Sequence, residues 1–103
     1  MDRKQFEAHV AAALDELPAD LAAKLENVAV VVEDENAEEP DLFGLFDEQP
    51  YMPARVTIYR LPLVDEFGDD LGLLEEEIRV TVLHELAHYF GIDEQRLSEL
   101  GYD

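Results

Sequence analysis

The fold and the chemistry of this chain are both decided by one stretch, Val80–Phe90 (VTVLHELAHYF), and by the glycine that follows it, Gly91. Apolar residues surround the expected helix axis on nearly every side, which is typical of a helix that the rest of a fold encloses. Three ionisable groups interrupt this apolar surface: His84, Glu85 and His88. Because enclosing such groups is costly unless something pairs with them, we expect them to form a site.

The spacing of the two histidines favours a metal site. His84 and His88 are four residues apart, so they project from one helix face about 6 Å apart along the axis. Two imidazoles at that separation can tilt toward one zinc ion, with Zn–N distances of about 2.0–2.1 Å. Glu85 lies about 100° further round the helix, where it can reach a water on that ion as the general base of an HExxH site. The alternative is a pair of core histidines that hydrogen-bond to neighbours.

A catalytic zinc usually has a third protein ligand. Gly91 allows the chain to turn back toward the helix face, and two carboxylates follow it. We expect Glu94 to be the third ligand, although a first-turn carboxylate that the helix dipole favours is the competing interpretation. Asp93 is the alternative ligand, but its side chain also suits the N-cap of a last helix. His9 is a remote candidate that we expect on the side of the first helix.

The sequence predicts one α+β domain over residues 1–103, with a short, roughly three-stranded sheet packed against the helix that carries the site and flanked by other helices. Pro18 closes the first helix, Asp20 caps the second, and Asp69 or Asp70 caps the long one. The last helix returns Leu97 and Leu100 to the core. Helices are expected over residues 2–17, 20–25, 71–90 and 93–100, and strands over 28–32, 42–46 and 55–61.

Two of the expected strands carry further information. Val28–Val32 is short, β-branched and apolar, which indicates a strand buried on both faces. In Leu42–Phe46, Gly44 marks a bulge or a close approach of another segment. The acidic stretch Glu33–Asp41 is expected to be an exposed connection within the domain.

Composition excludes several classes of protein. The chain has no cysteine, so disulfides and thiolate zinc sites are excluded. Its 26 acidic and 7 basic residues give a net charge of −19, which repels phosphate backbones, so we expect no binding to nucleic acid. We interpret the charge as a solvated surface, although it could also steer cations or basic peptides to the protein.

No segment of the sequence suggests a membrane or secretion. The first residues, MDRKQFEAHV, lack the apolar core of a signal peptide. The longest apolar run, Val28–Val32, is far too short to cross a bilayer. We therefore expect a cytoplasmic protein without membrane contact.

At this point the chain resembles a known family. The run HELAHYFGIDEQRLSELGY (His84–Tyr102) resembles the active-site segment of the small bacterial zincin-like metallopeptidases, or minimal zincins. LFGLF (Leu42–Phe46) and EEEIRVTVLHELAHYFG (Glu75–Gly91) are similar to that family too. The resemblance covers most of residues 42–102 and is weak before them. It implies an α+β fold with a short sheet against the active-site helix.

The resemblance also implies one zinc ion per chain, held by the HExxHxxGxxD pattern of Asp-type zincins. On this sequence the last ligand position of the pattern is Glu94, so glutamate stands where the family has aspartate. The extra methylene moves the carboxylate by about 1.5 Å, which changes the geometry of the third ligand. The other positions of the pattern are His84, Glu85, His88 and Gly91.

These observations predict a zinc-dependent peptidase that acts on a peptide or protein substrate. Glu85 would take a proton from the attacking water and pass it to the leaving amine. A substrate strand would pair with an exposed sheet edge, for which we expect Arg55–Leu61. No tyrosine is singled out as an oxyanion donor; the candidates are Tyr51, Tyr59, Tyr89 and Tyr102.

Besides the peptidase, two hypotheses from other classes are a zinc-holding assembly module and an acidic mimic of nucleic acid. The short chain after Phe90 leaves little for a second lobe, so a protein partner could complete the cleft. For the same reason, and because Glu94 departs from the aspartate of the family pattern, the domain could be a zinc-holding assembly module without turnover. The third hypothesis, an acidic mimic of nucleic acid, leaves the HExxH helix unexplained.

Overall fold

The helix that carries the HExxH residues is the longest element of the computed structural model, which describes residues 1–100 except for the side chains of Glu94, Leu97 and Leu100. This helix, α4 (Leu71–Phe90), has the predicted bounds. It begins at Asp70, whose side chain accepts a hydrogen bond of 3.1 Å from the Leu73 N–H. It ends at Gly91, which adopts the left-handed conformation with φ 67° and ψ 31°. Both helix ends are therefore set by local sequence.

The sheet has three strands in the order β1-β3-β2. β1 (Val28–Glu33) runs parallel to β3 (Ala54–Tyr59), and β2 (Gly44–Asp47) runs antiparallel to it. β3 is thus the central strand and is nearly all buried. The expectation that Arg55–Leu61 forms an exposed edge was wrong, because both sides of β3 are paired; the edges belong to β1 and β2.

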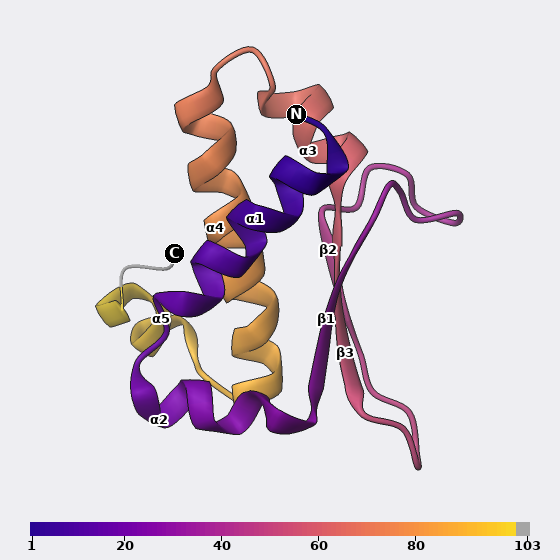
Figure 1. Ribbon diagram of the computed structural model, residues 1–103. Helices are drawn as coiled ribbons and strands as arrows, with labels where there is room; N and C mark the ends of the chain where they lie inside the picture. Colours follow the sequence, from indigo (N-terminus) through magenta and orange to yellow (C-terminus); the bar gives the residue numbers. More distant parts are fainter. Residues whose placement is uncertain (101–103) are drawn as a thin grey trace.

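β1 also differs from its prediction. Within Val28–Val32 only Val32 is buried, so the strand is not enclosed on both faces. The physical reason is its place at the edge of the sheet, which the strand's own sequence does not specify. Figure 1 shows β1 running beside the helical layer, with α1 and α4 on the same side of the sheet.

The core lies between this side of the sheet and three helices, α1, α3 and α4. α1 (Arg3–Asp15) begins with a capping box between Asp2 and Gln5 and packs across α4. The stripe of α4 that faces the core repeats every four residues, as expected for one side of a helix. One buried cluster joins α1, the strands, α3 and α4: Phe6, Val10, Ala13, Val32, Val56, Ile58, Leu63, Leu74, Ile78, Val82 and Leu86.

A helix that the sequence did not suggest follows β3 directly. α3 spans Arg60–Phe67, so the predicted strand over 55–61 ends two residues early, at Tyr59. Pro62 lies within α3. Proline fits here because it lies in the first turn, where a backbone N–H has no partner within the helix. Arg60 leaves the sheet and pairs with Asp34 at 3.1 Å.

The short helical segments near both ends agree only partly with expectation. α2 (Ala19–Ala22) continues into a 3-10 helix, η1 (Ala23–Asn27), in place of one helix over 20–25. The N-cap position is Pro18 and forms no side-chain hydrogen bond, so Asp20 is not the cap. α5 (Glu94–Leu100) lies close to its predicted range, and the predicted packing of Leu97 and Leu100 falls outside the described side chains.

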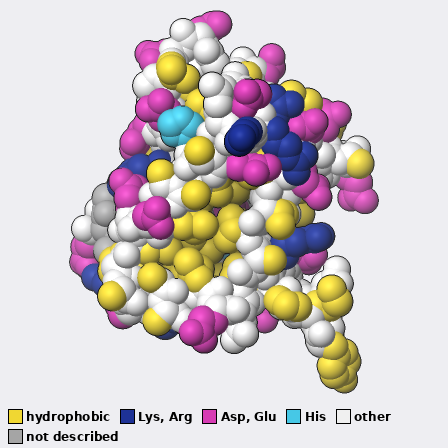
Figure 2. Space-filling model, viewed as in Figure 1, with side chains coloured by type: hydrophobic (Ala, Val, Ile, Leu, Met, Phe, Trp, Pro, Cys, Tyr) yellow, Lys and Arg dark blue, Asp and Glu magenta, His cyan; other side chains and the backbone are white. Residues whose placement is uncertain are grey.

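The acidic connection and the surface fit the high negative charge. Residues 33–41 are exposed apart from the partly buried Asn36, whose side chain accepts from the Glu38 and Glu39 N–H groups. In Figure 2, Asp and Glu side chains surround an apolar area on the face shown. Within the described residues, no helix is long and apolar enough to span a membrane.

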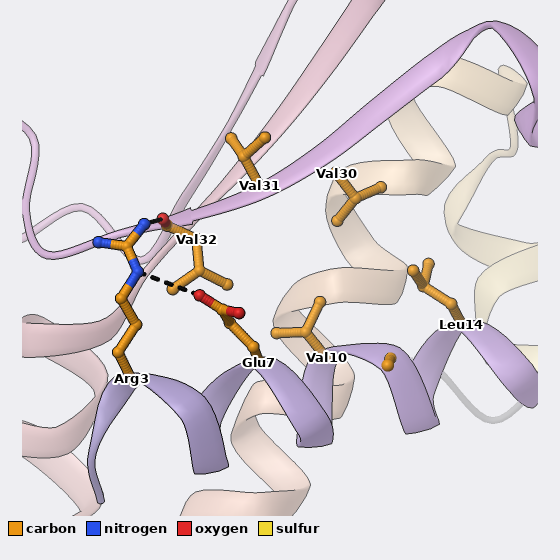
Figure 3. Close-up of a pocket in the computed structure, with 8 residues that line it drawn as sticks. Arg3, Glu7, Val10, Leu14, Val30, Val31 and Val32 are labelled. Atoms are coloured by element: carbon orange, nitrogen blue, oxygen red, sulfur yellow. Dashed lines mark hydrogen bonds and ion pairs between the residues drawn. The ribbon is translucent and has the colours of Figure 1, made fainter.

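Part of that apolar area is a groove of about 350 Å³ between α1 and β1, drawn in Figure 3. Val10 and Leu14 of α1 face Val30 of β1 across it. At one end Arg3 donates hydrogen bonds to the Val32 carbonyl and to the Glu7 carboxylate. The lining of this groove does not include the HExxH residues.

Candidate metal centre

The two histidines of the HExxH pattern face each other on α4. The ring centroids of His84 and His88 are 5.5 Å apart, and the ring planes meet at 71°. Among the described residues, neither imidazole makes a hydrogen bond or an ion pair. The interpretation of this pair as hydrogen-bonded core histidines therefore has no support in the structure, and both rings keep a nitrogen available for a metal.

These residues are more exposed than the sequence suggested. His88 is exposed, and His84 and Glu85 are partly buried. The expectation of an enclosed helix holds only in part. α4 is buried in the main core and also through a second cluster with Leu83 and Ala87. The surface that carries His84 and His88 is the open one, so solvent and ligands reach it without crossing the core. The cost of burying these groups is therefore lower than in an enclosed helix, and the geometry of the donors is what defines the site.

Glu85 lies directly against β2. A Cβ atom built on Gly44 would lie 2.8 Å from Glu85 Cγ and 3.4 Å from Glu85 Cδ. The same atom would lie 3.1 Å from Thr81 Cγ2, one turn earlier on α4. The expectation that Gly44 marks a close approach is thus confirmed, and the partner is the proposed general base.

Other contacts hold β2 onto the same part of α4. The rings of Phe46 and Tyr89 have centroids 6.1 Å apart, at 52° to each other. Phe46 and Gly44 are two residues apart on β2, so both positions lie on the same face of the sheet. The sequence pattern of Leu42–Phe46 indicated a strand, but nothing in it indicated that Phe46 would meet Tyr89.

A tight turn follows the histidines. The Ile92 N–H donates to the Ala87 carbonyl at 3.0 Å, and the Gly91 N–H donates to the His88 carbonyl at 3.4 Å. This pair of bonds is a Schellman motif, which satisfies carbonyls at the end of a helix. Ile92 also packs against Leu83 and Ala87. The predicted reversal of the chain at Gly91 is therefore present.

The residues after this turn separate the two candidates for the third ligand. The Asp93 carboxylate accepts a hydrogen bond of 2.8 Å from the Arg96 N–H, so it caps α5. Glu94 is the first residue of α5, and its side chain lies outside the described part of the structure. Within the described residues, no three His, Asp or Glu side chains gather closely enough to hold a metal ion.

The remaining candidates lie elsewhere. His9 on α1 faces Glu75 near the start of α4, with 3.6 Å between His9 Nε2 and Glu75 Oε1. Among the tyrosines, Tyr59 is buried and accepts a hydrogen bond from the Asn36 amide. Tyr51 is fully exposed between β2 and β3. Only Tyr89 lies next to the histidines in the chain, and Tyr102 is outside the described residues.

This α+β domain carries on one helix a carboxylate and two imidazoles that bond to no other described residue. These are the donor types of a metal-dependent hydrolase, since zinc in such sites is held mainly by imidazole and carboxylate groups. A model of the zincin-like metallopeptidase family matches residues 25–102 of this chain. The match covers well over half of the sequence, so the chain belongs to this family. A comparison with curated proteins found no match.

Proposed function

We propose that the protein is a zinc-dependent peptidase in which His84 and His88 hold the metal, Glu94 is the third ligand and Glu85 is the general base. The observation that carries this proposal is the pair of imidazoles 5.5 Å apart on α4, free of hydrogen bonds to other described residues. Family membership supports a metal-binding hydrolase with a peptide or protein substrate.

The donor set fits zinc. Two imidazoles one turn apart provide the nitrogen ligands that zinc prefers, and neither must first break a bond to a described neighbour. Asp93 is engaged in capping α5, so Glu94 remains the better candidate for a carboxylate ligand. When bound, zinc would supply a water of lowered pKa and polarise the carbonyl of the scissile bond.

The chain's own residues would then perform the proton transfers and hold the substrate. The Glu85 carboxylate would accept the proton of the attacking water and donate it to the leaving amine. An extended substrate would pair with the free edge of β2, because this edge strand lies against Glu85 through Gly44. β2 thus replaces the segment Arg55–Leu61 as the proposed substrate edge.

The function is tested by metal analysis and peptide hydrolysis on purified protein with two single substitutions. We expect about one zinc per chain in the wild type, strong loss of zinc in His88→Ala, and retained zinc in Glu85→Gln. Removal of a general base typically lowers the rate about 10²–10⁴-fold, so Glu85→Gln should lower kcat by that amount. Unchanged hydrolysis by Glu85→Gln would disprove the assigned mechanism.

A second candidate function is a zinc-holding assembly module without turnover. The open position of the site favours it, since His88 is exposed and His84 is only partly buried, whereas catalytic pockets usually enclose their substrate. The same experiment separates the two functions. Zinc binding that depends on His88, with no hydrolysis of a broad peptide library, would identify the module.

A further inference from the structure

Gly44 of β2 lies directly against the proposed general base, Glu85. Its Cα has no side chain, yet it is buried, because Glu85 and Thr81 fill the space where a Cβ would stand. Real Cβ atoms essentially never approach another heavy atom to 2.8 Å, which is the separation that Glu85 Cγ would have. A larger residue at position 44 must therefore move Glu85, the strand, or both.

The surroundings favour movement of Glu85. Gly44 pairs with Ile58 in the ladder to β3, and Ile58 is completely buried in the core. On the other side, Thr81 is held because its hydroxyl donates to the Glu77 carbonyl at 2.7 Å. No such bond to another described residue fixes the Glu85 carboxylate, so its side chain is the part that can yield.

We infer that Gly44 is a positioning residue for Glu85: the absence of a Cβ allows the Glu85 side chain to lie against β2 on the histidine-bearing part of α4. Its consequence for catalysis rests on the proposed function, while the contact itself does not. The inference predicts that alanine at position 44 displaces the carboxylate and leaves the two imidazoles in place.

The contact is tested without zinc or activity by a double-mutant cycle on thermal stability. Gly44→Ala is expected to lower Tm by several degrees in the wild-type background, because the new methyl group overlaps Glu85. In a Glu85→Ala background the same substitution should lower Tm by less than half as much, since only the Thr81 contact remains. Equal shifts in the two backgrounds would overturn the inference.

The functional arm measures zinc content, kcat and KM for Gly44→Ala. A displaced base should lower kcat at least tenfold, with zinc content unchanged and KM within about twofold. Gly72→Ala is the matched control, because a Cβ there meets only Asp70 Oδ1 at 3.5 Å, and all three values should stay at wild-type levels.

The two arms distinguish the possible failures. If the wild type hydrolyses no peptide but the cycle shows coupling, the proposed function fails and the contact stands. If the wild type is active and Gly44→Ala keeps its kcat, the positioning role is wrong while the function stands. If Gly44→Ala loses zinc as well as activity, Gly44 acts on the whole site and the specific link to Glu85 is wrong.

Discussion

At the scale of single residues, Gly91 connects the helix that carries the site to the segment that contains Glu94. Its φ of 67° lies in the left-handed region, and a Cβ there would meet no atom of the described residues within 4 Å, its two chain neighbours aside. Alanine would therefore suffer only the conformational cost, about 1–2 kcal/mol. We expect Gly91→Ala to lower Tm by about 4–8 °C per kcal/mol, measured by thermal unfolding.

Gly72→Ala is again the suitable comparison, because Gly72 lies in the first turn of α4 and an added Cβ would make only an ordinary contact, at 3.5 Å to Asp70 Oδ1. Alanine is the better helix former by about 0.5–1 kcal/mol, so this variant should unfold at an equal or higher temperature. If both variants shifted Tm in the same direction by the same amount, the left-handed turn would not explain the effect at Gly91.

The candidate site could be predicted from residue types and their spacing, but its exposure could not. Spacing alone singles out His84, Glu85 and His88 as candidates, and their placement on one helix is confirmed. Whether His88 faces the core or the solvent depends on which side of α4 packs on the sheet, which is a long-range property. The same holds for Gly44, where the sequence indicated a close approach without naming Glu85 as the neighbour.

At the scale of elements, α4 was predictable because its ends carry strong local signals. Asp70 provides a side-chain cap and Gly91 a left-handed stop. α3 was missed because the alternation of apolar and polar residues in Arg55–Tyr59 favoured a strand that continued to Leu61. Pro62 is equally compatible with a turn and with the first turn of a helix. The order of the strands could not be predicted either. β1 pairs with β3, although β2 lies between them in the sequence.

The N-terminal cap of α4 should contribute to stability without affecting the metal. Asp70→Ala removes the acceptor of the Leu73 N–H and is expected to cost about 1 kcal/mol, measured by urea unfolding. Asp70→Asn retains the acceptor and should lose much less. Zinc content should be unchanged in both variants, because His84 and His88 lie in the other half of the helix. Equal losses for Ala and Asn would show that the carboxylate charge, rather than the cap, stabilises the helix.

At the scale of the whole molecule, the outer edge of β1 is a liability, because unpaired strand edges favour aggregation. Arg3 bonds to the Val32 carbonyl at this edge and closes one end of the groove between α1 and β1 (Figure 3). The net charge of −19 opposes self-association further. The Arg3 contact and the net charge both oppose aggregation through the edge of β1, which lies apart from the HExxH residues.

The core is complete without any metal, so removal of zinc should not unfold the protein. None of the buried cluster residues is a histidine or a carboxylate, and the cluster joins α1, α3, α4 and the sheet. Zinc fingers differ, because their folding free energy comes from the metal. After treatment with EDTA we expect an unchanged helical circular dichroism spectrum and a cooperative thermal transition at lower temperature.

Added zinc should then stabilise the native state by mass action, by about 2.7 kcal/mol when its free concentration is a hundred times Kd. The double variant His84→Ala with His88→Ala should lose this increment and keep the Tm of the metal-free wild type, because these side chains contribute nothing to the buried cluster. A metal-free wild type without helical signal would mean that zinc, rather than the apolar core, holds α4 against the sheet. In that case the two histidines would form a structural centre, and the reaction assigned to Glu85 would lose its basis.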